Sequence, residues 1–260
     1  MLSLDTVSKS FASGVTALEG VSFAVARGEF LSLVGPSGCG KSTALRLIAG
    51  LTAPSSGAVT WTGARPRTGF VFQDAALLPW ATVARNVALP LELKGETGSI
   101  SDRVGAALET VGLSAFANAF PRELSGGMRM RVSIARAIAA DAELLLMDEP
   151  FAALDELTRE RLNDELRTLW ATRGLTVIFV THSIYESVYL SSRVVVMSPR
   201  PGRVVGDLTM DEPRERTPDY RLSPAYGERC KAVRAALVKG GVGGPPARTM
   251  TMDLSDGAPL

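Results

Sequence analysis

The chain has few cysteines and histidines, which limits the chemistry that thiols and imidazoles could support. Its two cysteines are Cys39 and Cys230, and its one histidine is His182. Two cysteines are too few for a disulfide framework, and they show no metal-site spacing. A reducing compartment fits this composition. His182 is the single imidazole available for acid–base chemistry.

An excess of charge and long apolar runs are also lacking. The 260 residues include 28 Lys and Arg and 27 Asp and Glu, a formal net charge of +1. This balance gives no general attraction to nucleic acid or anionic lipid. No apolar run reaches the ~20 residues that span a bilayer, and residues 1–11 do not resemble a signal peptide. We therefore expect no transmembrane segment, and any role at a membrane requires a partner.

Short apolar segments alternate with helical patterns over most of the chain. Between about residues 82 and 140 the apolar spacing is helical, and no clear strand interrupts it. Alternating strands and helices predict an α/β fold with a parallel sheet. After Pro199 one more helix is predicted near 225–238, and the Gly- and Pro-rich residues 239–260 are predicted to be disordered. Strands are predicted at 2–8, 20–26, 30–34, 59–62, 69–72, 144–147, 176–180 and 194–197, and helices at 104–111, 128–140, 156–170 and 184–190.

A glycine-rich segment, Gly35-Pro-Ser-Gly-Cys-Gly-Lys41-Ser42, lies between a predicted strand and a predicted helix. This context is typical of a phosphate-binding loop, because glycines let backbone N–H groups surround phosphate oxygens and the helix dipole adds positive charge. Lys41 is expected to bind the β- and γ-phosphates of ATP, and Ser42 to bind Mg²⁺. An ordinary glycine turn before a helix is the alternative. The predicted cradle comprises Gly35, Pro36, Ser37, Gly38, Cys39, Gly40, Lys41, Ser42 and Thr43, with Cys39 as a small filler.

A second segment, Leu144-Leu-Leu-Met-Asp148-Glu149-Pro150, is an apolar strand with two adjacent carboxylates at its C-terminal end. Ligands bind at this edge of open parallel sheets. Asp148 is predicted to hold Mg²⁺, and Glu149 to act as the general base that polarises the attacking water. Taken alone, the segment could also be a strand that enters a turn.

With Leu124-Ser125-Gly126-Gly127-Met128 between them, these two segments resemble the nucleotide-binding subunits of ABC transporters. The LSGG signature separates this family from other P-loop ATPases. The resemblance covers about residues 2–238. It implies a P-loop NTPase fold of the RecA type, with an N-terminal antiparallel β-subdomain and an α-helical subdomain inserted at about 82–140. Residues 1–238 would form this domain.

The resemblance also implies roles for single residues. Gln73 matches the glutamine that senses Mg²⁺ and contacts the permease side, and Asp155 matches a residue that crosses the dimer interface. His182 matches the switch histidine at the γ-phosphate; it also follows an apolar strand and begins a helix, which favours this role over a structural one. Phe11 lies where the family has an aromatic that stacks on adenine, although a core residue that closes a strand is the alternative.

The signature residues Ser125, Gly126 and Gly127 precede a predicted helix and would offer free N–H donors. In the family this loop binds the γ-phosphate of the ATP held by the opposite subunit. The resemblance therefore implies a head-to-tail homodimer with two ATP molecules in its interface. Met128 and Met130 stand where the family usually has glutamine, and neither change removes a phosphate donor.

Two further segments narrow the resemblance to bacterial importers of nitrate, sulfonates and taurine. They are Phe72-Gln73-Asp74 with Leu77-Leu-Pro-Trp80, and Ser198-Pro-Arg-Pro-Gly202-Arg203. For Leu-Pro-Trp a packing turn is the alternative. The basic residues that follow the last strand alternate with acidic ones, which favours a solvated face over a surface for anions or lipid. They are Arg200, Arg203, Arg214, Arg216 and Arg221, interleaved with Asp211, Glu212 and Glu215.

The sequence thus predicts the ATPase subunit of an ABC importer for a small solute such as nitrate, a sulfonate, taurine or a heterocycle. Expected partners are a second copy of the chain, a transmembrane permease and, indirectly, a solute-binding protein, but no nucleic acid. Its expected place is the cytoplasmic face of the inner membrane. A non-transport ABC ATPase acting on DNA or the ribosome is the alternative. Against it, residues 42–124 hold no heptads or cysteine pairs, and the chain has one cassette. Glu149 and His182 argue against a binding module without catalysis.

Overall fold

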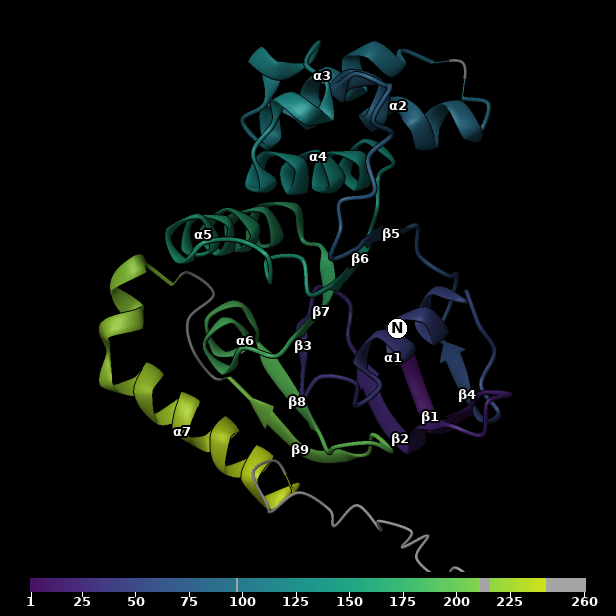
Figure 1. Ribbon diagram of the computed structural model, residues 1–260, viewed down its shortest axis with the longest axis vertical. Helices are drawn as coiled ribbons and strands as arrows, with labels where there is room; N and C mark the ends of the chain where they lie inside the picture. Colours follow the sequence, from purple (N-terminus) through teal and green to yellow (C-terminus); the bar gives the residue numbers. More distant parts are fainter. Residues whose placement is uncertain (97, 211–215, 242–260) are drawn as a thin grey trace, which may run out of the picture.

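The structure, a computed structural model, describes residues 1–96, 98–210 and 216–241. These residues form two β-sheets and the helices α1 to α7 (Figure 1). From residue 242 on, the predicted tail lies outside the described residues, as do Asp211, Glu212, Arg214 and Glu215. Within the described ranges, no helix has both the length and the apolar character that crossing a membrane requires.

The larger sheet has six strands in the order β5-β6-β7-β3-β8-β9. The first five in this order pair in parallel, as predicted, whereas β9 pairs antiparallel with β8. Strand β9 was not predicted, because it is a mostly half-exposed edge strand in a Pro- and Arg-rich segment. The bounds are Phe30–Val34 (β3), Thr68–Val71 (β5), Leu144–Asp148 (β6), Thr176–Thr181 (β7), Arg193–Met197 (β8) and Val204–Thr209 (β9).

Alternate side chains of the central strands enter two separate cores. In β3, Phe30 and Val34 belong to one core, and Leu31 and Leu33 belong to the other. Burial on both faces explains why these strands are continuous apolar runs. Helix α1 (Lys41–Ala49) and the smaller sheet cover the second core. The first core receives residues from α5 (Glu156–Arg173), α6 (Ile184–Leu190), α7 (Pro224–Lys239) and the helical insertion.

The smaller sheet is antiparallel, with the order β2-β1-β4, which confirms the N-terminal β-subdomain. Its strands are Leu2–Ser10 (β1), Thr16–Val25 (β2) and Ser56–Trp61 (β4). The turn between β1 and β2 is closed by a hydrogen bond from the N–H of Phe11 to the oxygen of Val15, at 2.9 Å. Phe11 therefore lies in a turn at the end of this hairpin.

Helices α2 (Val83–Leu93), α3 (Ile100–Thr110) and α4 (Gly126–Ala139) form the predicted insertion, and Figure 1 shows them beyond β5 and β6. No strand occurs among the described residues of this region. Arg136 of α4 joins it to α2, because Nε donates to the backbone oxygen of Asn86 and Nη2 to Oδ1 of Asn86, both at 3.0 Å. Burial lowers the pKa of Arg136 from its ordinary value.

The segment after residue 215 is anchored by arginines. The Arg216 guanidinium donates to the oxygens of Tyr189 (2.6 Å) and Ser191 (3.0 Å) at the C-terminal end of α6. A cation at this position satisfies free carbonyls and opposes the helix dipole. Arg221 donates to Oδ1 of Asp164 at 2.6 Å. The predicted solvated face was therefore wrong for Arg216 and Arg221. Both side chains bind groups that are distant in the sequence, and the local pattern of charges does not reveal such contacts.

Candidate active site

The glycine-rich loop lies between β3 and α1, at the C-terminal edge of the larger sheet. Gly38 and Gly40 have φ angles of +75° and +106°, and a Cβ on Gly40 would lie 2.7 Å from the backbone oxygen of Ala17. Gly40 is also the N-cap of α1 and brings no side-chain cap to the helix. The loop thus leaves the N-terminal N–H groups of α1, and its positive dipole end, available to an anion.

Lys41 is held inside this loop. Its side chain is 3% exposed, and Nζ donates to the backbone oxygens of Gly35 at 2.8 Å and Pro36 at 3.0 Å. Cys39 is buried in the same loop, and burial raises the pKa of its thiol. The ammonium is within reach of the helix end, so the phosphates of a nucleotide would compete with the loop carbonyls for it.

Ser42 and Asp148 meet across the edge of the sheet. The Ser42 hydroxyl donates to Oδ1 of Asp148 at 2.7 Å, although the residues are far apart in sequence. Burial raises the pKa of Asp148, an effect that the Ser42 hydrogen bond opposes and the neighbouring Glu149 carboxylate adds to. A hydroxyl and a carboxylate are the oxygen ligands that Mg²⁺ prefers. The two groups therefore fit the predicted metal.

Glu149 follows β6 with a left-handed backbone, at a φ of +46°. This conformation is uncommon for a residue other than glycine and costs about 1 kcal/mol. Its N–H donates to the backbone oxygen of Val180 at 3.0 Å, which holds the peptide in place. The side chain reaches two groups from other strand ends: Oε1 lies 3.8 Å from Nζ of Lys41, and Oε2 lies 3.2 Å from Nδ1 of His182.

A cavity of about 460 Å³ lies beside these groups; His182 contacts Glu149 but does not itself line the cavity. Phe11 is 42% exposed at its rim, so the alternative of a core residue does not hold. Gln73 follows β5, well after the glycine-rich loop in the sequence, yet it lines the same cavity. The lining residues are Phe11, Val15, Ala17, Ser37, Gly38, Gly40, Lys41, Ser42, Thr43, Gln73, Asp148, Glu149 and Arg200.

The predicted signature residues do not join this cavity. Ser125 is the N-cap of α4, and its Oγ accepts a hydrogen bond from the N–H of Met128 at 3.2 Å. Ser125 and Gly127 line a different cavity, of about 300 Å³. Asp155 is the N-cap of α5 and accepts a hydrogen bond from the N–H of Thr158 at 3.0 Å, which lowers the pKa of its carboxyl. One chain therefore assembles only part of the predicted ATP site.

Gln73 connects the two parts. It lies in the segment between β5 and α2, and it lines a second cavity of about 460 Å³ together with Gly126, Arg129 and Leu154. The same side chain lines the cavity of the glycine-rich loop. Gln73 is thus placed between the larger sheet and the helical insertion.

Arg200 is a site residue that sequence reasoning missed. Its Nε donates to the backbone oxygen of Gly38 at 3.0 Å, and its side chain lines the cavity of Lys41. Arg200 is exposed, as the predicted solvated face requires, but its side chain also contacts the glycine-rich loop. The segment Ser198-Pro-Arg-Pro-Gly202-Arg203 stood out in the sequence, but nothing local indicated that it packs on the glycine-rich loop.

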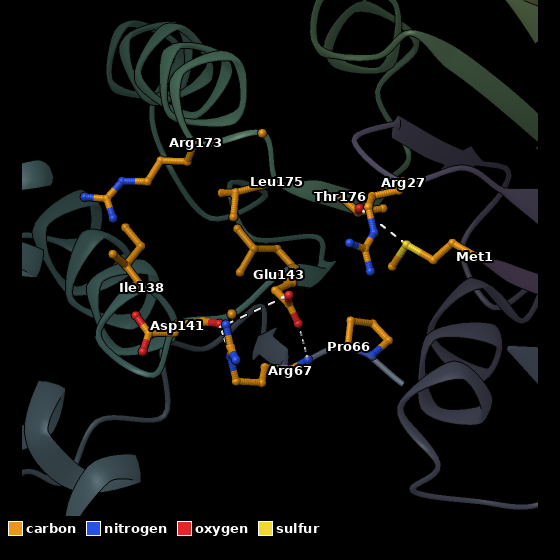
Figure 2. A pocket seen from close by; sticks show the side chains of 13 residues that line it. Met1, Arg27, Pro66, Arg67, Ile138, Asp141, Glu143, Arg173, Leu175 and Thr176 are labelled. Atoms are coloured by element: carbon orange, nitrogen blue, oxygen red, sulfur yellow. Dashed lines mark hydrogen bonds and ion pairs between the residues drawn. The ribbon is translucent and has the colours of Figure 1, made fainter. Parts of the chain in front are cut away.

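Another cavity, of about 310 Å³, lies at the opposite edge of the larger sheet, near the first residues of β6 and β7. Figure 2 shows Arg27, Arg67 and Arg173 around it, with Glu143 between them. Arg67 lies 3.9 Å from Glu143, and Arg173 donates to the hydroxyl of Thr110 at 2.8 Å. Arg67 is thus paired with Glu143, and the carboxylates that line this cavity have no glycine-rich loop beside them, so it is not the candidate active site.

The chain is similar to known proteins in sequence and in fold. The profile of the ABC transporter family matches residues 18–152. The aliphatic sulfonates import ATP-binding protein SsuB of Bacillus cereus (strain ATCC 10987 / NRS 248) is 41% identical, over 93% of this chain and 97% of that protein. The dimeric ATP-binding cassette MJ0796 bound to ADP and Pi is 34% identical, with a TM-score of 0.72 over 82% of this chain and 100% of that one. The structure of cbiO1 from Clostridium perfringens, part of the transporter complex cbiONQ, is 28% identical with a TM-score of 0.73, over 80% of this chain and 88% of that one. The chain therefore belongs to the ATP-binding subunits of the ABC transporter family, with relatives in the sulfonate importer group.

Proposed function

We propose that this chain is the ATP-hydrolysing subunit of an importer and that it energises uptake of a small solute through a separate permease. The observation that carries the proposal is the position of the Glu149 carboxylate. It lies 3.8 Å from Nζ of Lys41 and 3.2 Å from Nδ1 of His182, beside the glycine-rich loop. A base next to the lysine that binds phosphate is what attack by water on the terminal phosphate requires.

ATP would occupy the cavity of the glycine-rich loop. Its volume of about 460 Å³ lies in the range of small-molecule sites. The phosphates would bind backbone N–H groups of residues 37–43 and the ammonium of Lys41. The exposed ring of Phe11 at the rim is available to stack on adenine. The cavity thus offers an apolar surface at Phe11 for the base and a cationic group at Lys41 for the phosphates.

Mg²⁺ would be held by Ser42 and Asp148, with Gln73 lining the same cavity. When bound, the ion supplies positive charge that neutralises the phosphates. The hydrogen bond between Ser42 and Asp148 brings both oxygens together in advance. The raised pKa of Asp148 reflects a partly buried carboxylate, and such a group gains from a nearby cation.

Glu149 would accept the proton of the attacking water. Lys41 and His182 approach its two carboxylate oxygens from different sides, so both restrict its orientation. The His182 side chain is 55% exposed, and it would contact the terminal phosphate from beside Glu149. Glu149 would thus carry out the proton transfer, and His182 would position the Glu149 carboxylate.

A second copy of the chain would complete the site. Ser125, Gly126 and Gly127 lie at the start of α4, away from the chain's own glycine-rich loop. The dimeric cassette MJ0796 bound to ADP and Pi supports a dimer that binds nucleotide, and we propose that two copies of this chain pair head to tail with nucleotide in the interface. Asp155, at the start of α5, would cross the same interface. Two ATP molecules would then be shared between two half-sites.

The permease would contact the Gln73 segment and the helical insertion. This segment exposes apolar side chains: Phe72 is 41% exposed and Trp80 is 74% exposed. Gln73 lines both the cavity of the glycine-rich loop and the cavity at Gly126, so it would transmit ATP binding to the helical insertion. The subunit would then act at the cytoplasmic face of the inner membrane, and a solute-binding protein would deliver the solute from the other side.

The likeness to SsuB supports a sulfonate or a related small anion as the solute. The test is to purify the chain with its chromosomal permease and solute-binding protein and to assay ATP hydrolysis in liposomes. The panel comprises nitrate, taurine, alkanesulfonates and small heterocycles. We expect one solute to raise turnover, and only when the binding protein is present. If no solute changes the rate of ATP hydrolysis and the chain sediments with DNA or ribosomes, transport is contradicted and a non-transport ABC ATPase is favoured.

A further inference from the structure

The loop between β8 and β9 packs directly against the glycine-rich loop. The N–H of Gly202 donates to the oxygen of Ala17 at 2.9 Å, and the oxygen of Gly202 accepts from the N–H of Glu19 at 3.0 Å. A Cβ on Gly202 would lie 2.1 Å from the backbone oxygen of Cys39. This close approach fixes the position of the β8–β9 loop relative to the phosphate cradle.

The β8–β9 loop is also rigid within itself. The Ser198 hydroxyl accepts a hydrogen bond from the N–H of Arg203 at 3.0 Å and donates to the oxygen of Pro201 at 3.1 Å. Pro199 and Pro201 restrict φ on either side of residue 200. Arg200 is therefore presented by a turn that has little freedom to move away from the glycine-rich loop.

Arg200 and Arg203 lie in the same turn but have different environments. Arg203 Nη2 lies 2.8 Å from Oε2 of Glu19, so its charge is balanced. Arg200 uses Nε for the oxygen of Gly38 at 3.0 Å, and no carboxylate of the described chain pairs with it. A guanidinium has five N–H donors. Besides Nε–H, the Arg200 guanidinium therefore has N–H donors that can serve a ligand, and Arg200 lines the same cavity as Lys41.

We propose that Arg200 is a further nucleotide-binding residue, which stays on Gly38 through Nε and offers its other N–H groups and its charge to the phosphates of ATP or ADP. The inference rests on the proposed function of the cavity. Arginine suits this task because it is always charged and its fork of donors matches phosphate oxygens. The Gly38 contact orients the side chain before the nucleotide binds, which reduces the entropy lost on binding.

The test measures the affinity of the full-length chain for fluorescent ATP and ADP in four proteins: wild type, R200M, R200K and R203M. We expect R200M to weaken binding about five- to tenfold, as for loss of one partly exposed charge-assisted hydrogen bond. R200K should recover only part of the affinity, because it keeps the charge but loses the fork of donors and the Nε contact with Gly38. R203M should bind like wild type. The difference between wild type and R200M should shrink at high salt, because salt screens an exposed charge.

Two results would overturn the inference. One is wild-type affinity in R200M. The other is an equal loss in R200M and R200K that is insensitive to salt and accompanied by a lower unfolding temperature, which would make Arg200 only a support of the glycine-rich loop. K41A, measured in parallel, separates this failure from that of the proposed function. If K41A keeps wild-type affinity, the cavity does not bind nucleotide; if K41A loses affinity and R200M does not, only the role of Arg200 is wrong.

Discussion

Nδ1 of His182 lies 3.2 Å from Oε2 of Glu149, and the Glu149 backbone has a φ of +46°. The two residues follow different strands, β7 and β6, which are neighbours in the larger sheet. The uncommon backbone of Glu149 directs its side chain along the sheet edge toward both His182 and Lys41. Strain that the surrounding structure maintains at such a position is typical of functional sites.

E149Q should bind ATP but hydrolyse it about 10²–10⁴-fold more slowly, because an amide cannot accept the proton of the attacking water. If His182 positions Glu149, the loss in the double variant E149Q/H182A should be much smaller than the product of the two single losses. Phosphate release and nucleotide binding, measured on the same samples, check both statements. Near-normal turnover of E149Q would exclude Glu149 as the base.

K41A should lower the affinity for ATP at least about tenfold, because the buried ammonium is a charge-assisted partner of the phosphates. Calorimetric titration with ATP measures the effect. K231A is the matched control, since Lys231 is an exposed lysine that pairs with Glu228 on α7. Equal affinities of K41A and K231A would contradict the assignment of the phosphate cradle.

E186Q should flatten the pH dependence of stability. Burial raises the pKa of Glu186 from its ordinary value of 4.5, an effect that a hydrogen bond from Thr181 and the nearby Arg159 oppose. The folded chain therefore keeps this proton at pH values where the unfolded chain has lost it. The free energy of unfolding should then fall as the pH rises from 4.5 through the folded-state pKa.

Urea unfolding of wild type and E186Q across this pH range provides the measurement. The difference between the two curves isolates Glu186 from other carboxylates, including Asp148. A difference that does not change with pH would show that the pKa of Glu186 is not raised in the folded chain.

G69A and G105A should change stability in opposite directions. A Cβ on Gly69 would lie 2.6 Å from Cβ of Ala137, where β5 meets α4, so the added methyl should destabilise the fold by about 1–3 kcal/mol. Gly105 lies inside α3 with nothing within 4 Å of an added Cβ. There alanine should stabilise the helix by about 0.5–1 kcal/mol. Urea unfolding of both variants checks the signs, and a stabilised G69A would show that α4 packs less closely on β5.

Local patterns were sufficient for much of the fold. The apolar run before Asp148, the glycine-rich loop before α1 and the helical spacing of the insertion each predict an element that the structure contains. Strand β9 escaped because an edge strand needs neither continuous nor strictly alternating apolar residues. The burial of Arg216 was not predicted, because its partners are backbone carbonyls at the end of α6. Every residue has a backbone carbonyl, so the sequence does not indicate which ones bind an arginine.

By itself, the sequence determined the chemistry that is available: a phosphate cradle, two adjacent carboxylates, one histidine and a signature loop. Only the tertiary structure decided which of these groups meet. The strand order β5-β6-β7-β3-β8-β9 places Glu149 beside His182 and Lys41 and sets Arg200 on Gly38. The helical insertion keeps Ser125 away from the chain's own glycine-rich loop. The physical reason is that strand order follows from burying two apolar faces of one sheet at once. That requirement depends on the whole chain and not on any local pattern.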